Sequence, residues 1–566
     1  MKRCVQIHPF WFCLSFILFF SCKEKNKIPS LESIGLINLK RGEVTWCGPP
    51  DGRFGTVEFE TSCSVGGGKD FNLAMALLHS FEYDEAEKVF AKIIDQSPDC
   101  AMAYWGVAMS NYHPLWAPPS EAELEKGSRA LAVARGLERI PRRESDYLEA
   151  LSLFYEDWQN TDHRTRSMRF EKAMEKLYYT WPDDIEAAIY YSLALVAAAD
   201  PADKTFTRQK KAHSILTSLY PNEPDHPGIV HYIIHSCDYP ELAELALPAA
   251  RKYMSIAPSS AHALHMPSHI FTRLGLWDEC IQSNLVSAAS AKCYAENAGL
   301  KGHWDEELHA MDYLVYAYLQ KGENDLARQQ LEYLNTIHEV SPTNFKVAYA
   351  FAAIPSRFVL ENRLWNEAAT LQLPKINFLW QDYPWQTAIV HFTRLLGNVH
   401  LGHLDSARLE LAALEKIYDA LMAKKETYNA NQVLIQINSA KAWIQLQEGK
   451  NSEALRLMDM AAQMEDNTEK HPVTPGEVIP ARELLGDMLL QVNQPGKALE
   501  AYEINLKRHP NRFNSLYGAG LAAAKSNNPE KAQSFYDLLT SVANPNRSER
   551  PELEKARSFL KRSDIK

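Results

Sequence analysis

Histidine pairs spaced four residues apart are the feature of this sequence with the clearest potential for chemistry. One pair, His231 and His235, lies in the segment HPGIVHYIIHS, and the other, His265 and His269, lies in AHALHMPSHIF. Eight of the 19 histidines fall between Asp225 and Met311, a concentration that composition alone does not explain. Imidazole nitrogens suit zinc, copper, iron and nickel, so the pairs are candidate ligands of a transition metal.

The spacing of the pairs predicts both a helix and a repeat. Residues four apart share one face of a helix, with Cβ atoms about 5–6 Å from each other. His231 and His265 are separated by 34 residues, and so are His235 and His269. Equivalent residues at a fixed period indicate a repeat architecture, which must position the histidines.

The same period recurs near the C-terminus on small and aromatic residues. Three residues return 34 positions later: Gly486, Ala498 and Tyr502 recur as Gly520, Ala532 and Tyr536. This pattern is similar to the tetratricopeptide repeat, in which two antiparallel helices pack through small residues. Further units begin near Gly67, Ala101, Pro227, Ala261, Leu308, Ala388 and Ile435. We therefore expect an all-α protein whose helix-turn-helix repeats form a right-handed α-solenoid.

The tetratricopeptide resemblance implies which side chains face the concave groove, namely positions 2, 5, 9, 12 and 13 of each first helix. His231, His235, His265 and His269 occupy positions 5 and 9 of two successive units, and His262 occupies position 2. The same register adds six further groove residues: His79, His113, Arg273, His309, Asp312 and Tyr316.

Three hypotheses follow for this His-rich groove. In the first, it binds an anionic or extended peptide, a partner protein or another small ligand without metal. In the second, His231, His235, His265 and His269, with His262 nearby, bind zinc, copper or iron, and Asp312 or Glu306 supplies an oxygen. Such a site needs neutral imidazoles, so its affinity should fall below about pH 6.5. In the third, each histidine is structural and the protein is a scaffold.

The leading expectation is a binding protein of the cell envelope, with the metal-binding protein or metal-dependent enzyme as the alternative. The sequence leaves open whether the protein is an enzyme. The stretch Gly66–Lys69 lacks the spacing of a phosphate-binding loop, and GxSxG, CxxC and HExxH motifs are absent. A net charge of -11 and a pI of about 6.0, without a basic stripe, exclude a nucleic-acid binder.

The N-terminus predicts export. Lys2 and Arg3 precede an apolar run over residues 10–20, as in a signal peptide. Ser21 then precedes Cys22, which resembles a bacterial lipobox with Phe19 where leucine is usual. We therefore expect Cys22 to be lipidated and the protein to be anchored in the bacterial cell envelope, at the outer membrane.

The cysteines beyond the anchor divide into two groups. Cys47 and Cys63 lie in an irregular Gly- and Pro-containing stretch, and we expect them to form a disulfide in an oxidising compartment. Four others lie within helical patterns and are interpreted as small core residues: Cys100, Cys237, Cys280 and Cys293.

From about residue 45 to 540, the chain resembles a group of large, His-rich tetratricopeptide lipoproteins of the bacterial envelope whose function is uncharacterised. The resemblance rests on segments such as FNLAMALLHSFEYDEAEKVF and HALHMPSHIFTRLGLWDE. The expected organisation is a signal peptide (1–21), a tether with an irregular segment (22–66), first units (67–143), irregular helical repeats (144–226), central His-rich units (227–342), C-terminal units (343–545) and a tail (546–566).

Overall fold

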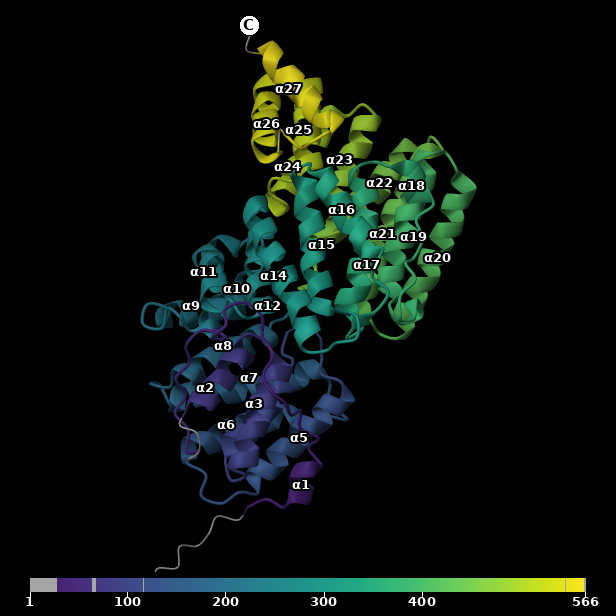
Figure 1. The fold of residues 1–566 in the computed structure, drawn as a ribbon. Coiled ribbons are helices and arrows are strands. Elements are labelled where there is room, and N and C mark those ends of the chain that lie inside the picture. The colour runs from purple at the N-terminus through teal and green to yellow at the C-terminus, as the bar shows by residue number, and fades with distance from the viewer. Residues whose placement is uncertain (1–27, 64–67, 116, 545, 564–566) are drawn as a thin grey trace, which may run out of the picture.

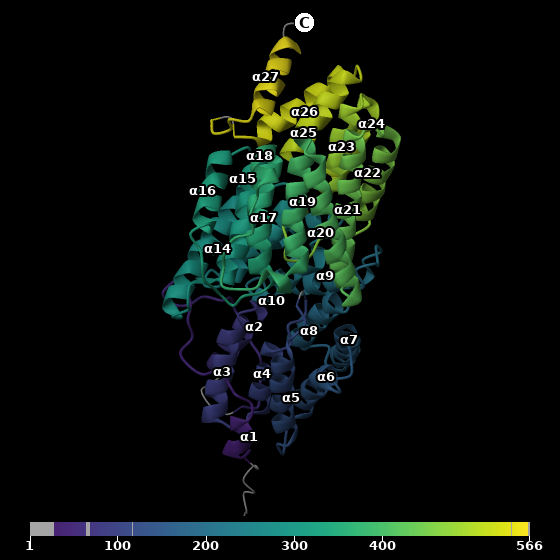
Figure 2. The same cartoon turned by 90° about the vertical axis from the view of Figure 1, so that its right-hand side faces the viewer.

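The computed structural model describes residues 28–63, 68–115, 117–544 and 546–563. The expected signal peptide and Cys22 lie outside these residues. The described chain is mainly helical, and consecutive antiparallel helices stack in sequence order (Figures 1 and 2). This confirms the all-α solenoid of tetratricopeptide type. Within the described residues, no helix combines the length and the apolar character needed to cross a membrane.

The N-terminal part consists of a short helix followed by helix pairs. Regular pairs continue through residues 144–226, where the sequence period is blurred. The bounds are α1 (Leu31–Gly35), α2 (Lys69–His79), α3 (Tyr83–Gln96), α4 (Ala101–Ser110), α5 (Glu121–Arg135), α6 (Arg142–Tyr155), α7 (His163–Thr180), α8 (Ile185–Ala197) and α9 (Thr207–Leu219).

The central part carries the histidine pairs on the first helices of successive repeat units. Its helices are α10 (Pro227–Cys237), α11 (Ala243–Ile256), α12 (Ala261–His265), α13 (Pro267–Leu274), α14 (Trp277–Asn297), α15 (Asp305–Gln320) and α16 (Asn324–Leu334). The break between α12 and α13 falls at Pro267, because proline has no N–H for a helical hydrogen bond. Two short strands, β1 (His303–Trp304) and β2 (Val340–Ser341), pair in parallel beside this region.

The C-terminal part continues the stack. Its elements are α17 (Phe345–Glu361), α18 (Trp365–Ala369), the 3₁₀ turn η1 (Trp380–Asp382), α19 (Pro384–His400), α20 (Leu404–Ala423), α21 (Thr427–Gln447), α22 (Asn451–Asp466), α23 (Ala481–Gln491), α24 (Pro495–Arg508), α25 (Phe513–Lys525), α26 (Pro529–Val542) and α27 (Pro551–Ser563).

The small residues of the repeat permit close packing of the paired helices. A Cβ atom built at Gly486 would lie 2.7 Å from the Tyr502 ring, and one at Gly520 would lie 2.5 Å from the Tyr536 ring. Both distances are too short for any larger residue without a shift of the neighbouring helix. The 34-residue recurrence in the sequence therefore reflects a repeated contact between the two helices of a unit.

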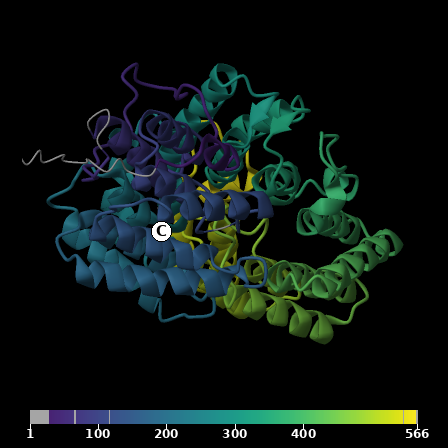
Figure 3. The ribbon, with the colours of Figure 1, turned by 90° about the horizontal axis from the view of Figure 1, so that it is seen from below.

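The stack curves until its C-terminal units return to the central ones. Seen from below, the chain winds from the N-terminal helices through α14 and α15 to the helices around α20 (Figure 3). The Trp277 indole donates a hydrogen bond of 3.0 Å to the Asn511 carbonyl oxygen. The backbone N–H of Asn544 likewise donates a hydrogen bond of 3.0 Å to the Lys321 carbonyl oxygen.

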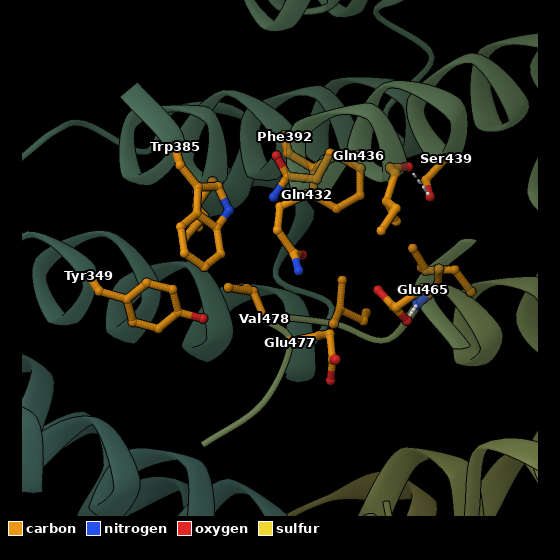
Figure 4. A pocket seen from close by; sticks show the side chains of 14 residues that line it. Tyr349, Trp385, Phe392, Gln432, Gln436, Ser439, Glu465, Glu477 and Val478 are labelled. Carbon is orange, nitrogen blue, oxygen red and sulfur yellow. Dashed lines mark hydrogen bonds between the residues drawn. The ribbon is translucent and has the colours of Figure 1, made fainter. Parts of the chain in front are cut away.

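The stretch between α22 and α23, residues 467–480, lies inside the curve of the solenoid, and we call it the inner segment. Its Gly476 carbonyl oxygen accepts hydrogen bonds from Arg357 at 2.9 Å and from Tyr349 at 3.2 Å. Figure 4 shows its Glu477 and Val478 beside residues of α17, α19 and α21, among them Tyr349 and Trp385. The concave face is therefore covered here by the protein's own chain.

The predicted disulfide between Cys47 and Cys63 is wrong. Cys47 pairs with Cys293 of α14, and Cys63 pairs with Cys100 at the start of α4. The irregular segment runs extended across the helices, so each cysteine meets a helical partner instead of the other. Cys237 and Cys280 are free and buried, as their core interpretation requires, but that interpretation is wrong for Cys100 and Cys293.

Candidate metal centre

Six histidines from the first helices of three successive repeat units form one continuous cluster; in the second of these units the first helix is divided into α12 and α13. His231 and His235 come from α10, His262 and His265 from α12, His269 from α13 and His309 from α15. The rings of His231 and His262 are 5.1 Å apart between centroids, and those of His265 and His309 are 4.1 Å apart. We call this set the six-histidine cluster. It unites the metal-site residues proposed from the sequence with His309, which was placed with the groove residues.

The first half of the cluster contains His265, His269 and His309, whose ligand atoms all lie within 4.8 Å of one another. The Nε2 atoms of His265 and His269 are 3.1 Å apart. Two nitrogens bound to one metal at about 2.0–2.1 Å lie roughly 2.9–3.4 Å apart, depending on the bond angle. The spacing of these two nitrogens is therefore that of two ligands of a single ion.

Hydrogen bonds fix the protons of these two rings. His265 donates from Nδ1 to the Asn284 side-chain oxygen at 2.6 Å, and His269 donates from Nδ1 to Asp238 at 3.0 Å. The Asn284 amide nitrogen is directed at the Cys280 carbonyl oxygen, 2.8 Å away, which settles the orientation of that amide. A neutral imidazole has one N–H, so both Nε2 atoms present lone pairs. The two lone pairs face each other.

The second half of the cluster contains His231, His235 and His262, again with ligand atoms within 4.8 Å of one another. His231 donates from Nδ1 to the His79 carbonyl oxygen at 2.6 Å, and its Nε2 lies 2.9 Å from Nε2 of His235. His262 presents Nδ1 to Glu306 at 3.7 Å. A carboxylate or carbonyl behind a ring nitrogen is the usual support of a metal-binding histidine.

A neighbouring set, His79, Glu186 and His226, has the opposite arrangement. Gly228 donates its backbone N–H to Nδ1 of His226 at 3.2 Å, so His226 donates from Nε2 to Glu186 at 2.9 Å. His79 likewise accepts from the Tyr232 hydroxyl and donates to the other Glu186 oxygen at 2.9 Å. Each Glu186 oxygen therefore accepts a hydrogen bond from one of these histidines, so the carboxylate needs no metal ion to satisfy it.

Burial favours the neutral form of five of the six cluster histidines. It lowers the pKa of His231, His235, His265 and His309 well below the usual value, and neighbouring histidines lower it further. The pKa of His269 is also lowered by burial, although Asp238 opposes the shift. Neutral imidazoles are the form that binds metals.

Two buried ionic groups flank the cluster. Burial alone would raise the pKa of Asp238, but Lys470 and Arg273 hold it well below its usual range. Lys470 lies 3.1 Å from Asp238, and Arg273 lies 2.8 Å from it. At the other end, Lys346 pairs with Glu306. The carboxylates that support His269 and His262 are therefore themselves fixed by cations.

The remaining residues predicted for the groove lie outside the cluster. His113 pairs with Glu123 at 3.1 Å. Asp312, expected as an oxygen ligand, pairs instead with Arg357. Tyr316 lies 3.4 Å from an Arg512 nitrogen. Arg273 binds the supporting residue Asp238, and the His79 carbonyl oxygen accepts from His231, so neither contributes a ligand atom.

Sequence reasoning missed the residues that support the histidines. Asp238 stands at position 12 of its unit, a groove position, so the repeat register could have identified it. Asn284 lies on the outer helix α14, and Lys470 lies 232 residues from its partner Asp238. No local pattern marks either of them.

Comparison with known proteins supports the fold alone. Residues 484–547 match the family described as Tetratricopeptide repeat, and no curated protein matches the sequence. Among solved structures, the chain is similar to a human IFIT1 dimer with PPP-AAAA at 12% identity and a TM-score of 0.34, covering 83% of this chain and 90% of that chain.

Two further helical-repeat structures are similar to the chain. Yeast Tom70 has 11% identity and a TM-score of 0.28, covering 88% of this chain and 96% of that one. The P58(IPK) TPR domain has 13% identity and a TM-score of 0.21, covering 68% of this chain and all of that one. Likeness this weak carries no inference about function. The helix pairs of the structure and the match at residues 484–547 identify the chain as a tetratricopeptide-type solenoid.

Proposed function

We propose that this protein is a tetratricopeptide-type scaffold that holds a transition metal in the six-histidine cluster. One observation carries the proposal: Nε2 of His265 and Nε2 of His269 lie 3.1 Å apart with lone pairs facing. Lone pairs at this distance repel unless a cation lies between them. A proton would have to charge a ring whose pKa burial lowers. A metal ion bound by both nitrogens removes the repulsion.

The donor set indicates the class of metal. Imidazole nitrogens and a nearby carboxylate, without a thiolate, suit zinc, copper or iron. The free cysteines among the described residues do not belong to the set, since Cys237 contacts His213 and Cys280 contacts Thr272 and Asn284. The two halves of the cluster each provide three ligands, and the ring centroids of His235 and His269 are 6.5 Å apart. The cluster thus has ligands for two neighbouring ions.

Metal analysis of protein purified without a polyhistidine tag tests the proposal. We expect stoichiometric zinc, copper or iron in the unaltered protein, lost in the double variant His265→Ala with His269→Ala. His391→Gln is the matched control, because His391 pairs with Glu410 outside the cluster. Protein that contains no metal and gains none on incubation with these ions would refute the proposal.

The hypothesis of an open groove that binds an extended peptide has less support. The inner segment covers the concave face beside α17, α19 and α21, and its Gly476 already takes the hydrogen bonds that Tyr349 and Arg357 would offer a peptide. A partner protein, if one binds, would use the outer surfaces of the solenoid.

We further propose that the protein is exported and anchored in the bacterial cell envelope through a lipid on Cys22. The support is the signal-like start with Ser21 before Cys22 and the two disulfides, which persist in oxidising compartments. Fractionation of cells that express the full chain tests this. Cys22→Ala should move the protein from the membrane to the soluble fraction, whereas an unchanged distribution would refute lipidation at this residue.

A further inference from the structure

A pocket of about 490 Å³ adjoins the six-histidine cluster. Its wall includes His235, which is the cluster member that lines it, together with Asp238 and Arg273. The pocket is also lined by Tyr428 at the start of α21 and by Lys470 of the inner segment. A volume of a few hundred Å³ is that of a pocket for a small organic ligand.

Arg164, Arg273 and Lys470 line the pocket, and the Lys470 ammonium has unused donors. The side chain of Lys470 is 4% exposed, and its ammonium has three N–H groups. Among the described residues, Asp238 is the acceptor that it contacts, at 3.1 Å. A buried ammonium is costly unless its donors are satisfied. Lys470 therefore has capacity for a second, anionic acceptor.

The carboxylates of the pocket are already engaged. Asp238 accepts from His269, Arg273 and Lys470. Glu469 pairs with Lys204 at 2.5 Å and faces Arg508 at 3.7 Å. Oε2 of Glu469 accepts no hydrogen bond from the described residues, but three cationic side chains, Arg164, Arg273 and Lys470, line the pocket against these two carboxylates, so the charge balance of the wall favours an anion.

The remainder of the wall is mostly apolar. Tyr239 and Tyr428 contribute aromatic rings, and Leu115, Val196 and Pro472 contribute aliphatic surface. A free inorganic anion would leave this surface in contact with water. A ligand that joins an organic group to the anionic group would cover this apolar surface, and the burial of that surface would favour binding.

We propose that this pocket binds a small carboxylate-bearing organic molecule, with its carboxylate on Lys470 and its body against Tyr239 and Tyr428. Because His235 forms part of the wall, the bound molecule lies beside the metal centre. The position of the bound molecule beside a metal ion rests on the proposed function, whereas binding of its carboxylate to Lys470 does not require a metal.

Calorimetric titration of the full-length protein with benzoate and with benzamide tests the proposal. The two compounds share a ring and differ in charge. We expect benzoate to bind at least about tenfold more tightly than benzamide, because the ammonium would otherwise remain unpaired. Equal affinity for the two compounds, or no binding of benzoate at millimolar concentration, would overturn the proposal.

Two variants assign the effect to Lys470. Lys470→Met should reduce the affinity for benzoate to that for benzamide, and Lys470→Arg should retain it. Lys531→Met, at an exposed ion pair with Glu503, is the matched control. If Lys470→Met does not fold, the comparison of benzoate and benzamide on the unaltered protein still decides the matter.

Metal analysis of the same samples separates this proposal from the proposed function. His265→Ala with His269→Ala should lose metal and still bind benzoate. If the protein binds benzoate but never contains metal, the carboxylate pocket is supported and the metal centre is refuted. If the protein contains metal but binds benzoate and benzamide equally, the metal centre is supported and the carboxylate pocket is refuted.

Discussion

The Nε2 atoms of His265 and His269 lie 3.1 Å apart, although a different oxygen already holds the Nδ1 proton of each ring. The oxygen behind His265 belongs to Asn284, on the outer helix α14. Asn284 provides no ligand atom itself, so it should act by orienting His265.

Removal of that acceptor should weaken metal binding. Loss of a hydrogen-bond partner behind a metal-binding histidine typically reduces metal affinity by about 10–100-fold. We therefore expect Asn284→Leu to reduce affinity by this amount, measured by competition with a chelator, while the six histidines stay in place. Asn398→Leu, which removes an asparagine that bonds the Arg394 carbonyl oxygen, is the control. Equal affinities in the two variants would contradict the assigned role.

The set of His79, Glu186 and His226 should behave differently, because its hydrogen bonds are complete without an ion. His226→Leu removes one of two N–H groups that stabilise the buried Glu186 carboxylate. We expect the free energy of unfolding to fall by about 1.5–3 kcal/mol, measured by urea denaturation, with unchanged metal content. Loss of metal in this variant would mean that the set is a binding site after all.

The metal-free protein should lose stability in mild acid. Burial lowers the pKa of several cluster histidines below the value of about 6.5 that they have in the unfolded chain. The unfolded state then binds more protons as pH falls. The stabilisation is complete above about pH 6.5 and decreases below it, by at most about 1.4 kcal/mol per pH unit for each histidine.

Urea denaturation at a series of pH values measures this dependence. The double variant His265→Gln with His309→Gln should show a shallower slope between about pH 6.5 and pH 5, because two titrating groups are gone. A slope identical to that of the unaltered protein would show that these histidines bind protons equally in the folded and unfolded states, and would contradict a lowered pKa.

The disulfides can be tested by peptide mapping without reduction. We expect Cys47 linked to Cys293 and Cys63 linked to Cys100. Cys47→Ser with Cys293→Ser should lower the free energy of unfolding by about 2–5 kcal/mol, because the bond closes a long loop in the unfolded chain. Cys237→Ala removes a thiol outside either bond and controls for the loss of a cysteine. Recovery of a peptide that links Cys47 to Cys63 would contradict the structure.

The sequence predicted the features that depend on local spacing. The contact of Gly486 with Tyr502 recurs in the next unit, so the repeat could be recognised from the period alone. His231 and His235 could be assigned to one face because four residues make about one helical turn. Their convergence with His265 and His269 followed from the equivalence of the two units.

Features that depend on distant parts of the chain could not be predicted in this way. Cys47 and Cys63 are close in sequence, yet the extended backbone between them leads each to a different helix. The inner segment resembles an ordinary inter-repeat loop, and nothing in its composition indicates that Lys470 meets Asp238. The sequence therefore predicted the convergence of the histidine pairs but not the groups that hold them or the pocket beside them.

The course of the inner segment also affects how the molecule unfolds. In most stacked-repeat proteins each unit touches only its neighbours, and end units can fray independently. Here Lys470 is bound to Asp238, 232 residues away, and Trp277 to Asn511, 234 residues away. An end repeat cannot detach without breaking contacts in the middle of the chain. We therefore expect a single cooperative transition over these units, and we expect deletion of the last repeats to destabilise the central helices as well.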